Sequence, residues 1–421
     1  METKTKKLEF PAGFLWGAAT SAHQVEGGTS NDWTEWEKNN AERLAKEVTG
    51  KWQTWQQEKF PEMFDPQNYI SHQACDHYHR YAEDFDLAKT LGHNAHRFSI
   101  EWSRIEPEEG KFDEREVEHY QKVLEALKAR GMEPFVTLWH WTMPVWLSSV
   151  GGVENDKFAD YFVRYTKYVT RKLEAEVKFW ITLNEPTSVI SHSYVFGNWP
   201  PQRRNIFVAQ KVYQRLATAH NKAYVEIKKI NQVFQVGFAN ILQFVEPLND
   251  NSPWDKLTTK VFDYFANNKF LKLVDGHNDF LTAQYYFHTR LKFPWLRKNE
   301  NKIVSDLGWE IYPEGIYHVL KNLQKYNLPI YVTENGLADA FDDKRAEFIK
   351  KHLFWIHRAM ETGVDVRGYF YWSLLDNFEW DKGFWPRFGL VEIDYKTLER
   401  KIRPSAWQYA KICQRNALLL S

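Results

Sequence analysis

The sequence predicts an α/β fold, a (β/α)₈ or TIM barrel, from three observations: eight short apolar runs, helix-like segments between them, and polar residues where the runs end. Strands that alternate with helices pair in parallel through right-handed crossovers, and eight such repeats suit closure into a barrel. A doubly wound open sheet is the alternative, but no glycine-rich phosphate loop follows the first run. The predicted strands are Phe14–Ala19, Asn94–Ile100, Pro134–Trp139, Phe179–Leu183, Gln235–Asn240, Phe280–Tyr286, Pro329–Thr333 and Gly368–Trp372.

The segments between these runs carry apolar residues at three- and four-residue spacing, which predicts amphipathic helices. No linker rich in proline, glycine or serine divides the chain, so we expect residues 1–421 to form a single domain. Long loops follow the first and eighth strands, and in a barrel they lie at the C-terminal face, where active sites are built. The predicted helices are Glu114–Arg130, Phe158–Leu173, Gln210–Ile230, Pro313–Tyr326 and Lys344–Thr362, and the loops are Val25–Ile70 and Ser373–Arg387.

The composition excludes several classes of partner. Lys+Arg and Asp+Glu both number 55, so neither nucleic acid nor an anionic membrane is expected to bind. The charged N-terminus, Met1–Lys7, lacks the apolar segment of a signal peptide, and no run is long enough to span a membrane, so we expect a soluble cytoplasmic protein. The two cysteines, Cys75 and Cys413, match no metal site, and we expect neither a metal nor a cofactor.

Polar residues gather at the ends of the predicted strands. Burying so many polar groups without partners would cost about 2–7 kcal/mol each, so we expect them to converge on one pocket. Two of them, Glu185 and Glu334, are carboxylates on opposite sides of the ring of strands, and glycoside hydrolysis needs such a pair. The residues at strand ends include Gln24, Arg97, His140, Trp141, Asn184, Gln284, Tyr285, Tyr286, Asn335, Trp372, Asp376, Asn377 and Glu379.

Six motifs occur in order along the chain, and together they resemble glycoside hydrolase family 1, the β-glucosidase and β-galactosidase family. The resemblance extends from Phe14 to about Ala410 and implies a β-glycosidase barrel. The motifs are FLWGAATSAHQVEG (14–27), HYHRYAEDFDLAKTLGHNAHRFSIEWSRI (77–105), TLNEP (182–186), YVTENG (331–336), YWSLLDNFEW (371–380) and RFGLVEIDY (387–395).

The resemblance also implies residue roles. Glu185 corresponds to the general acid/base and Glu334 to the nucleophile, with Arg97 and Tyr286 beside the nucleophile. Trp372 corresponds to the platform beneath the non-reducing sugar. Residues that hold sugar hydroxyls or line the pocket are, by the same correspondence, Gln24, His140, Trp141, Asn184, Glu379, Trp380 and Phe388.

These roles imply a retaining, exo-acting enzyme that cleaves terminal unphosphorylated β-D-glucosides, and also galactosides or fucosides, through a covalent glycosyl-enzyme intermediate. Arg97 and Tyr286 favour the charged form of the nucleophile. A second carboxylate about 5–5.5 Å from Glu185 is expected to raise its pKa by like-charge repulsion. The expected partner is a small β-glycoside or oligosaccharide, and the sequence leaves the oligomeric state open.

Three departures from the family pattern stand out. Gln284 replaces the usual asparagine, the pair Thr142-Met143 replaces Asp-Leu, and the segment between strands five and six is short. Two alternatives remain: a 6-phospho-β-glycosidase, although the usual Ser–Lys–Tyr phosphate set is absent and Glu379 would repel a phosphate, and a non-catalytic sugar-binding protein on the same scaffold, although both catalytic carboxylates are present.

Overall fold

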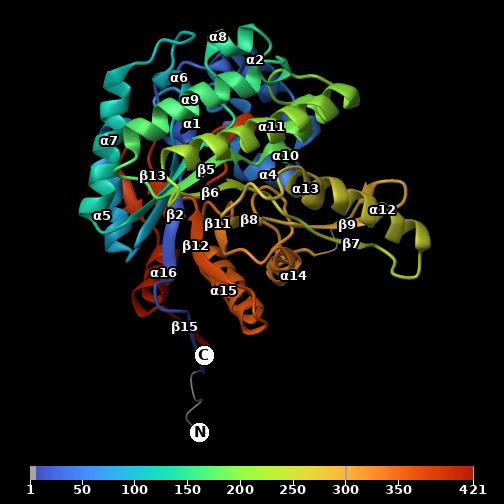
Figure 1. Cartoon of the computed structure of the whole chain (residues 1–421). Helices are drawn as coiled ribbons and strands as arrows, with labels where there is room; N and C mark the ends of the chain where they lie inside the picture. Colours follow the sequence, from blue (N-terminus) through green and yellow to red (C-terminus); the bar gives the residue numbers. More distant parts are fainter. Residues whose placement is uncertain (1–5, 299–300, 421) are drawn as a thin grey trace.

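A parallel eight-stranded barrel forms the centre of the computed structural model, which describes residues 6–298 and 301–420 (Figure 1). The strand order is β6-β5-β4-β3-β2-β12-β11-β8, so neighbours in the sheet follow one another along the chain except at β2–β12, where the first and last barrel strands pair. The sheet closes between its two end strands, where the Gln284 backbone N–H donates to the Asn240 carbonyl at 2.9 Å. Each predicted run overlaps one strand, and four strands, β4, β5, β11 and β12, extend one or two residues beyond the predicted bounds. The strands are β2 (Leu15–Ala19), β3 (Ala95–Ser99), β4 (Glu133–Trp139), β5 (Phe179–Asn184), β6 (Gln235–Ala239), β8 (Leu281–Gln284), β11 (Ile330–Asn335) and β12 (Val366–Trp372).

Long helices surround the barrel, and all five predicted ones are present. In α7 the Asp113 side chain caps the first turn by accepting from the Arg115 N–H, and the buried residues recur at helical spacing. The predicted start at Gln210 was four residues late, because Asn205 caps the helix instead. The helices that cover the strands are α5 (His77–Thr90), α7 (Glu114–Ala129), α9 (Phe158–Leu173), α11 (Ile206–Ile230), α14 (Gly315–Leu323), α15 (Arg345–Glu361) and α16 (Pro404–Arg415).

Aromatic rings fill the N-terminal half of the barrel interior. Phe135 and Phe179 stack with ring centroids 4.2 Å apart, and Phe280, Tyr331 and Phe370 pack around them. A barrel interior filled in this way is a core and not a channel. The space for a site therefore lies above it, at the C-terminal ends of the strands.

Shorter elements build the loops at that face. The loop after β2 contains α1 (Ala22–Val25), α2 (Asp32–Lys46), α3 (Val48–Lys51), α4 (Thr54–Lys59), η1 (Pro61–Phe64) and η2 (Pro66–Tyr69). The loops after β3, β4 and β5 contain α6 (Trp102–Ile105), α8 (Val145–Ser149), η3 (Gly152–Glu154), α10 (Pro186–Val189) and the π-helix η4 (Ile190–Phe196). The loop after β12 contains η7 (Trp380–Lys382), β13 (Val391–Ile393) and β14 (Arg400–Ile402).

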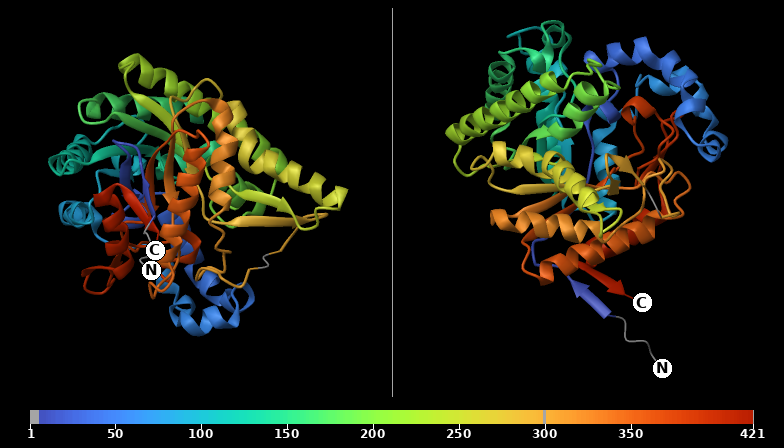
Figure 2. Two further views of the ribbon diagram at one scale, coloured as in Figure 1. Left: turned by 90° about the horizontal axis from the view of Figure 1, so that it is seen from below. Right: turned by 90° about the vertical axis from the view of Figure 1, so that its right-hand side faces the viewer.

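A lobe projects from one side of the barrel, at the right of Figure 1 and of the left view in Figure 2. Its small sheet has the order β10-β9-β7, and α12 packs against it. The lobe consists of β7 (Phe244–Pro247), α12 (Pro253–Asp263), the π-helix η5 (Tyr264–Asn268), α13 (Lys269–Leu273), β9 (His288–Lys292) and β10 (Leu296–Arg297).

The two ends of the described chain lie together. β1 (Lys6–Glu9) pairs antiparallel with β15 (Ala417–Leu420), as the right view of Figure 2 shows. Leu8 and Leu418 face each other in this pair and are both buried. Among the described residues, no helix has the length and apolar character that crossing a bilayer requires.

Candidate active site

A cavity of about 910 Å³ opens at the C-terminal ends of the barrel strands. Arg97 and Gln284 lie beneath its floor, where both are buried and contact residues of the lining. The fold thus brings together every site residue that the sequence predicted. Those that line the cavity are Gln24, His140, Trp141, Asn184, Glu185, Tyr286, Glu334, Trp372, Glu379, Trp380 and Phe388.

Glu334 lies near the end of β11 and has two strong partners. Its Oε1 accepts a charge-assisted hydrogen bond from Arg97, and its Oε2 accepts from the Tyr286 hydroxyl at 2.5 Å. Burial raises the pKa of Glu334, while the Arg97 cation and the Tyr286 hydrogen bond oppose that rise and favour the carboxylate. The expected contacts of Arg97 and Tyr286 with this carboxylate are therefore confirmed.

Glu185 follows β5 in the left-handed backbone region, at φ 40°. Such a conformation is costly for a residue with a side chain and is found where the surrounding structure fixes a group for function. Its Oε2 accepts from the Ser188 hydroxyl at 2.7 Å. Burial, and after it the charge of Glu334, raises the pKa of Glu185 to about 8. The sequence anticipated the direction of this shift, but it attributed to repulsion alone what burial mainly causes.

Asn184, which precedes Glu185 in the chain, links Arg97, Gln284 and His140 at the floor of the cavity. Its Oδ1 accepts from Arg97 at 2.6 Å and from Gln284 at 3.1 Å, and its Nδ2 donates to His140 at 3.0 Å. Because an amide nitrogen carries two hydrogens, one of them remains for a ligand. Gln284, which is one methylene longer than asparagine, thus supports Asn184 through its side-chain amide.

The opposite wall is built on the loop after β12. Gln24 donates to Asn377 at 3.0 Å and to the Phe378 carbonyl at 2.8 Å, which fixes its amide beside Glu379. Burial raises the pKa of Glu379 to about 7, although the ammonium of Lys382 opposes that rise. Trp380 has φ 52° and stacks on His140 with centroids 5.9 Å apart.

The ends of β11 and β12 approach each other closely at this wall. A Cβ at Gly336 would lie 1.9 Å from the carbonyl oxygen of Trp372, so only glycine fits there. Trp372 itself lines the cavity, and its peptide bond to Ser373 is cis. The glycine of the YVTENG motif thus places the Glu334 strand against the Trp372 strand.

Several supporting residues were not predicted from the sequence. His23 stacks on Trp380 with centroids 5.3 Å apart and hydrogen bonds to Glu37 at 2.7 Å. Its place beside Gln24 in the first motif was a usable indication. Ser188 stands three residues after Glu185, and this spacing, which makes residues neighbours on a helical turn, was another indication in the sequence. Trp33 is buried and packs behind Trp380, so it is a packing residue.

The substituted pair Thr142-Met143 anchors the loop that carries His140 and Trp141. The Thr142 hydroxyl donates to Glu101 at 2.9 Å, and the Met143 backbone N–H donates to Asp32 at 2.7 Å. Burial raises the pKa of Asp32 to about 7. This pair thus fastens the loop after β4 to the long loop after β2.

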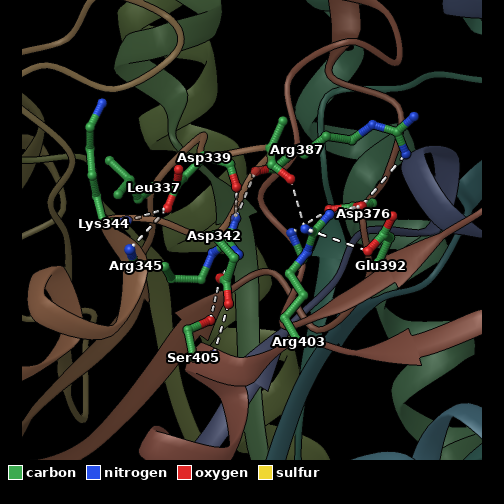
Figure 3. Close-up of polar contacts among 12 residues, drawn as sticks. Leu337, Asp339, Asp342, Lys344, Arg345, Asp376, Arg387, Glu392, Arg403 and Ser405 are labelled. Carbon is green, nitrogen blue, oxygen red and sulfur yellow. Dashed lines mark hydrogen bonds and ion pairs between the residues drawn. The ribbon is translucent and has the colours of Figure 1, made fainter.

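A network of ion pairs underlies the loops after β11 and β12 (Figure 3). Arg403 donates to Asp376 at 2.7 Å, and both side chains are buried. Arg345 donates to the Asp339 carbonyl at 2.7 Å and pairs with Asp342. Because Asp376 lies between Trp372 and Glu379 in sequence, the network fixes the loop after β12, which forms the opposite wall of the cavity.

Three histidines that lie close together in sequence, His72, His77 and His79, bond to separate partners. His77 pairs with Asp84 at 2.8 Å, and His79 pairs with Asp76 at 2.6 Å. Within residues 6–298 and 301–420, no group of three or more potential metal ligands was found.

Comparisons with known proteins agree with this arrangement. The family model described as Glycosyl hydrolase family 1 matches residues 6–306 and 295–418. Beta-glucosidase A of Thermotoga maritima is 33% identical, over 97% of this chain and 99% of that protein. A 6-phospho-beta-galactosidase of Staphylococcus epidermidis is 30% identical, over 97% and 99%. The solved beta-glycosidase from Pyrococcus horikoshii matches with a TM-score of 0.87 at 36% identity, covering 98% of this chain and 96% of that one.

Proposed function

The chain belongs to glycosyl hydrolase family 1, and on that premise we propose that it is a retaining, exo-acting enzyme for terminal unphosphorylated β-D-glucosides, and also for β-D-galactosides or β-D-fucosides. One observation carries the proposal: two buried carboxyl groups face one cavity in different electrostatic surroundings. Glu334 contacts a cation and a phenol, whereas burial and a neighbouring charge keep Glu185 protonated near neutral pH.

The proposed reaction has two displacements. In the first, the Glu334 carboxylate attacks the anomeric carbon while Glu185 gives its proton to the departing oxygen. The charge of Glu334 is lost in the covalent intermediate, so the pKa of Glu185 falls and its carboxylate becomes a base. In the second, Glu185 takes a proton from water, whose oxygen displaces Glu334 from the sugar.

The remaining predicted residues hold the sugar. We assign the remaining Nδ2 hydrogen of Asn184 to the 2-hydroxyl, where a hydrogen bond strengthens as positive charge develops on the ring. Trp372 supplies the apolar platform beneath the sugar, Phe388 lines the same pocket, and Gln284 supports Asn184. The groups assigned to the other hydroxyls are Gln24, His140, Trp141, Glu379 and Trp380.

Proton NMR of early hydrolysis tests the retaining mechanism. Two inversions at the anomeric carbon leave its configuration unchanged, so the sugar formed first should be the β anomer. An α anomer at the earliest times would exclude Glu334 as the nucleophile. Failure to hydrolyse any chromogenic β-glucoside would instead favour the non-catalytic alternative.

Azide rescue separates the roles of the two carboxylates. Glu334→Ala should lose turnover, and azide entering the emptied space should give an α-glycosyl azide. Glu185→Ala should still react with dinitrophenyl β-glucoside, whose leaving group needs little protonation, and should show a burst with a low apparent KM. Azide should then give the β-glycosyl azide. The same azide configuration from both variants would overturn the assignment.

The phosphorylated alternative is worth testing because one relative is a 6-phospho-beta-galactosidase. In this chain Lys382 donates to Asp381 at 2.6 Å, so the cation of this loop is already paired, and Glu379 lies beside it. We therefore expect kcat/KM for nitrophenyl β-glucoside to exceed that for its 6-phosphate by at least tenfold. A preference for the phosphorylated substrate would show that Lys382 binds phosphate despite its partner.

A further inference from the structure

Three charged side chains form a row behind the wall that carries Glu379. Asp381 and Lys382 follow Trp380 directly in η7, and Lys51 reaches them from the end of α3, in the loop after β2. Lys382 belongs to the cavity lining, and Asp381 and Lys51 lie outside it. The Lys51 side chain is 37% exposed and the Asp381 side chain 2%, so the row runs from solvent to the sugar wall.

The carboxylate of Asp381 accepts from three donors. The Lys382 ammonium donates to its Oδ1 at 2.6 Å, and the Lys51 ammonium donates to its Oδ2 at 3.1 Å. The indole N–H of Trp199 also donates to Oδ1, at 3.0 Å. Burial acts to raise the pKa of Asp381, but the two ammonium groups oppose it and hold that pKa well below its ordinary value. Asp381 is therefore an anion throughout the neutral pH range.

This carboxylate balances two cations that stand next to the site. Burial raises the pKa of Glu379, and the Lys382 ammonium is near enough to oppose that rise. An ammonium that is largely shielded from water attracts a nearby anion strongly, because the local dielectric constant is low. Carboxylate and phosphate both present paired oxygens to cations, so two lysines gathered around one carboxylate also suit a phosphate. The arrangement is an anion site that the protein's own Asp381 occupies.

The hydrogen bond to Trp199 is a separate, structural role of Asp381. Trp199 stacks on His192 with centroids 4.2 Å apart, and its ring lies 4.6 Å from that of Trp141. Both of these neighbours line the cavity. A neutral amide accepts a hydrogen bond from an indole as a carboxylate does, but it does not neutralise an ammonium. The two roles of Asp381 are therefore separable by experiment.

We propose that Asp381 determines selectivity for uncharged sugars, by occupying the two ammonium groups that would otherwise bind an anionic substituent of the sugar beside Glu379. The inference rests on the proposed function and specifies one of its determinants. Asp381 touches neither the sugar nor the reacting atoms and acts through Lys382 and Lys51. Glu379 repels an anionic substituent, and Asp381 removes the attraction that would outweigh this repulsion.

Asp381→Asn tests the proposal, because the amide keeps an acceptor for Trp199 and removes the charge. The measured quantity is kcat/KM for nitrophenyl β-glucoside 6-phosphate divided by kcat/KM for nitrophenyl β-glucoside, two substrates with the same leaving group. This ratio should rise by about tenfold or more, the gain expected from one or two charge-assisted hydrogen bonds. The gain should appear mainly in KM, since the phosphate is bound equally in the ground and transition states. An unchanged or lower ratio would overturn the proposal.

Asp306→Asn is the matched control. Asp306 is also buried and also pairs with a lysine of the loop after β2, Lys59, at 2.6 Å, but it lies outside the cavity lining. Its substrate ratio should match that of the parent enzyme. Asp381→Asn/Lys382→Met should lose most of the gain, because the cation released by the first substitution is then absent. A gain that persists in the double variant, or appears equally in Asp306→Asn, would contradict the proposal.

Ligand binding gives a measurement that does not depend on turnover. Calorimetric titration of Asp381→Asn with glucose 6-phosphate should give a Kd about tenfold or more below that of the parent, whereas the Kd for glucose should stay within about twofold. Asp381→Ser, which is smaller and also uncharged, is the second variant if the amide impairs folding. Equal changes in Kd for the two ligands would mean that Asp381 acts only on structure, and the proposal would fall.

The parent enzyme distinguishes the two levels of inference. If the parent hydrolyses nitrophenyl β-glucoside and Asp381→Asn has the same substrate ratio, the Asp381 proposal fails and the proposed function stands. If the parent prefers the 6-phosphate, or hydrolyses neither substrate, the proposed function fails and the Asp381 proposal falls with it.

Discussion

Glu185 and Glu334 have the same side chain, and their surroundings give them different tendencies to hold a proton. Both are buried, which favours the neutral form of each. Glu334 lies against Arg97 and Tyr286, whereas Glu185 accepts only the weaker hydrogen bond of the Ser188 hydroxyl as its side-chain contact in the described structure. On the proposed assignment, one fold thus prepares an acid and a nucleophile from the same residue type.

The pH dependence of kcat/KM follows from this arrangement. In the proposed mechanism cleavage needs Glu185 protonated, and its pKa is raised to about 8, so kcat/KM should decline as pH rises through that value. The Ser188 hydroxyl stabilises the carboxylate form, because its hydrogen bond lowers this pKa. Ser188→Ala should therefore move the alkaline limb to higher pH, measured with an unactivated alkyl or aryl glucoside.

Ser191→Ala is the control for this shift. Ser191 lines the same cavity, and its replacement leaves the Ser188–Glu185 hydrogen bond in place, so its alkaline limb should match that of the parent enzyme. Dinitrophenyl β-glucoside needs little acid catalysis and should show a weaker limb. A limb in Ser188→Ala that is unmoved, or moved to lower pH, would mean that another group sets it.

At the scale of elements, the strand ends carry most of the residues assigned to the site, and the loops after the strands hold these residues in position. The parallel barrel brings the C-terminal ends of β3, β4, β5, β11 and β12 to one face. The opposite wall depends on the loop that leaves the barrel after β12 and runs through η7 to β13. Its position is fixed by Asp376, which accepts from Arg403 at 2.7 Å and from the Gly389 N–H at 2.8 Å.

Removing the cation of this pair should destabilise the protein strongly. Arg403→Gln leaves the buried charge of Asp376 without its closest cation, and breaking a buried pair in this way costs about 3–5 kcal/mol. Urea unfolding measures the loss, and KM for glucosides should rise as the Glu379 loop loosens. Arg358→Gln breaks an exposed pair with Glu361 and should change stability by less than about 1 kcal/mol. Equal losses in the two variants would mean that the loop does not depend on the Arg403–Asp376 pair.

At the scale of the whole molecule, the two ends of the described chain close against each other on the barrel. The β1–β15 pair joins segments about 400 residues apart in sequence, and the His357 ring lies 3.1 Å from the Glu9 carbonyl oxygen. The pair stands away from the cavity, whose lining contains neither strand. It should therefore affect stability and leave catalysis unaffected.

Two neighbouring leucines test this separation. Leu418 is buried and Leu419 points outward at 37% exposure, so the same substitution samples the two faces of one strand. Leu418→Ala should lower the free energy of unfolding by about 2–5 kcal/mol, and Leu419→Ala by less than about 1 kcal/mol. kcat/KM per folded molecule should match the parent in both. A fall in kcat/KM for Leu418→Ala would reveal coupling between the chain ends and the site.

Local pattern predicted the architecture, and the resemblance to family 1 over six motifs predicted the site residues. The eight strands are short apolar runs. Their alternation with amphipathic helical segments is a local pattern that can be recognised from neighbouring residues. The strand ends predicted which side chains reach the C-terminal face, and the family motifs then implied roles for Glu185, Glu334 and Trp372 without coordinates. Helix boundaries were less certain, because the Asn205 cap outweighs the apolar periodicity that begins later.

Only the tertiary structure decided how these residues act on one another. Gln284 and Asn184 are 100 residues apart, and their hydrogen bond exists because β5 and β8 curve toward the same floor. The dominance of burial in the raised pKa of Glu185 likewise depends on every element that covers it. The same holds for the Asp381 carboxylate, which gathers donors from three separate loops. Periodicity is a property of neighbours in sequence, whereas desolvation, pairing and cavity shape depend on distances that only the closed barrel sets.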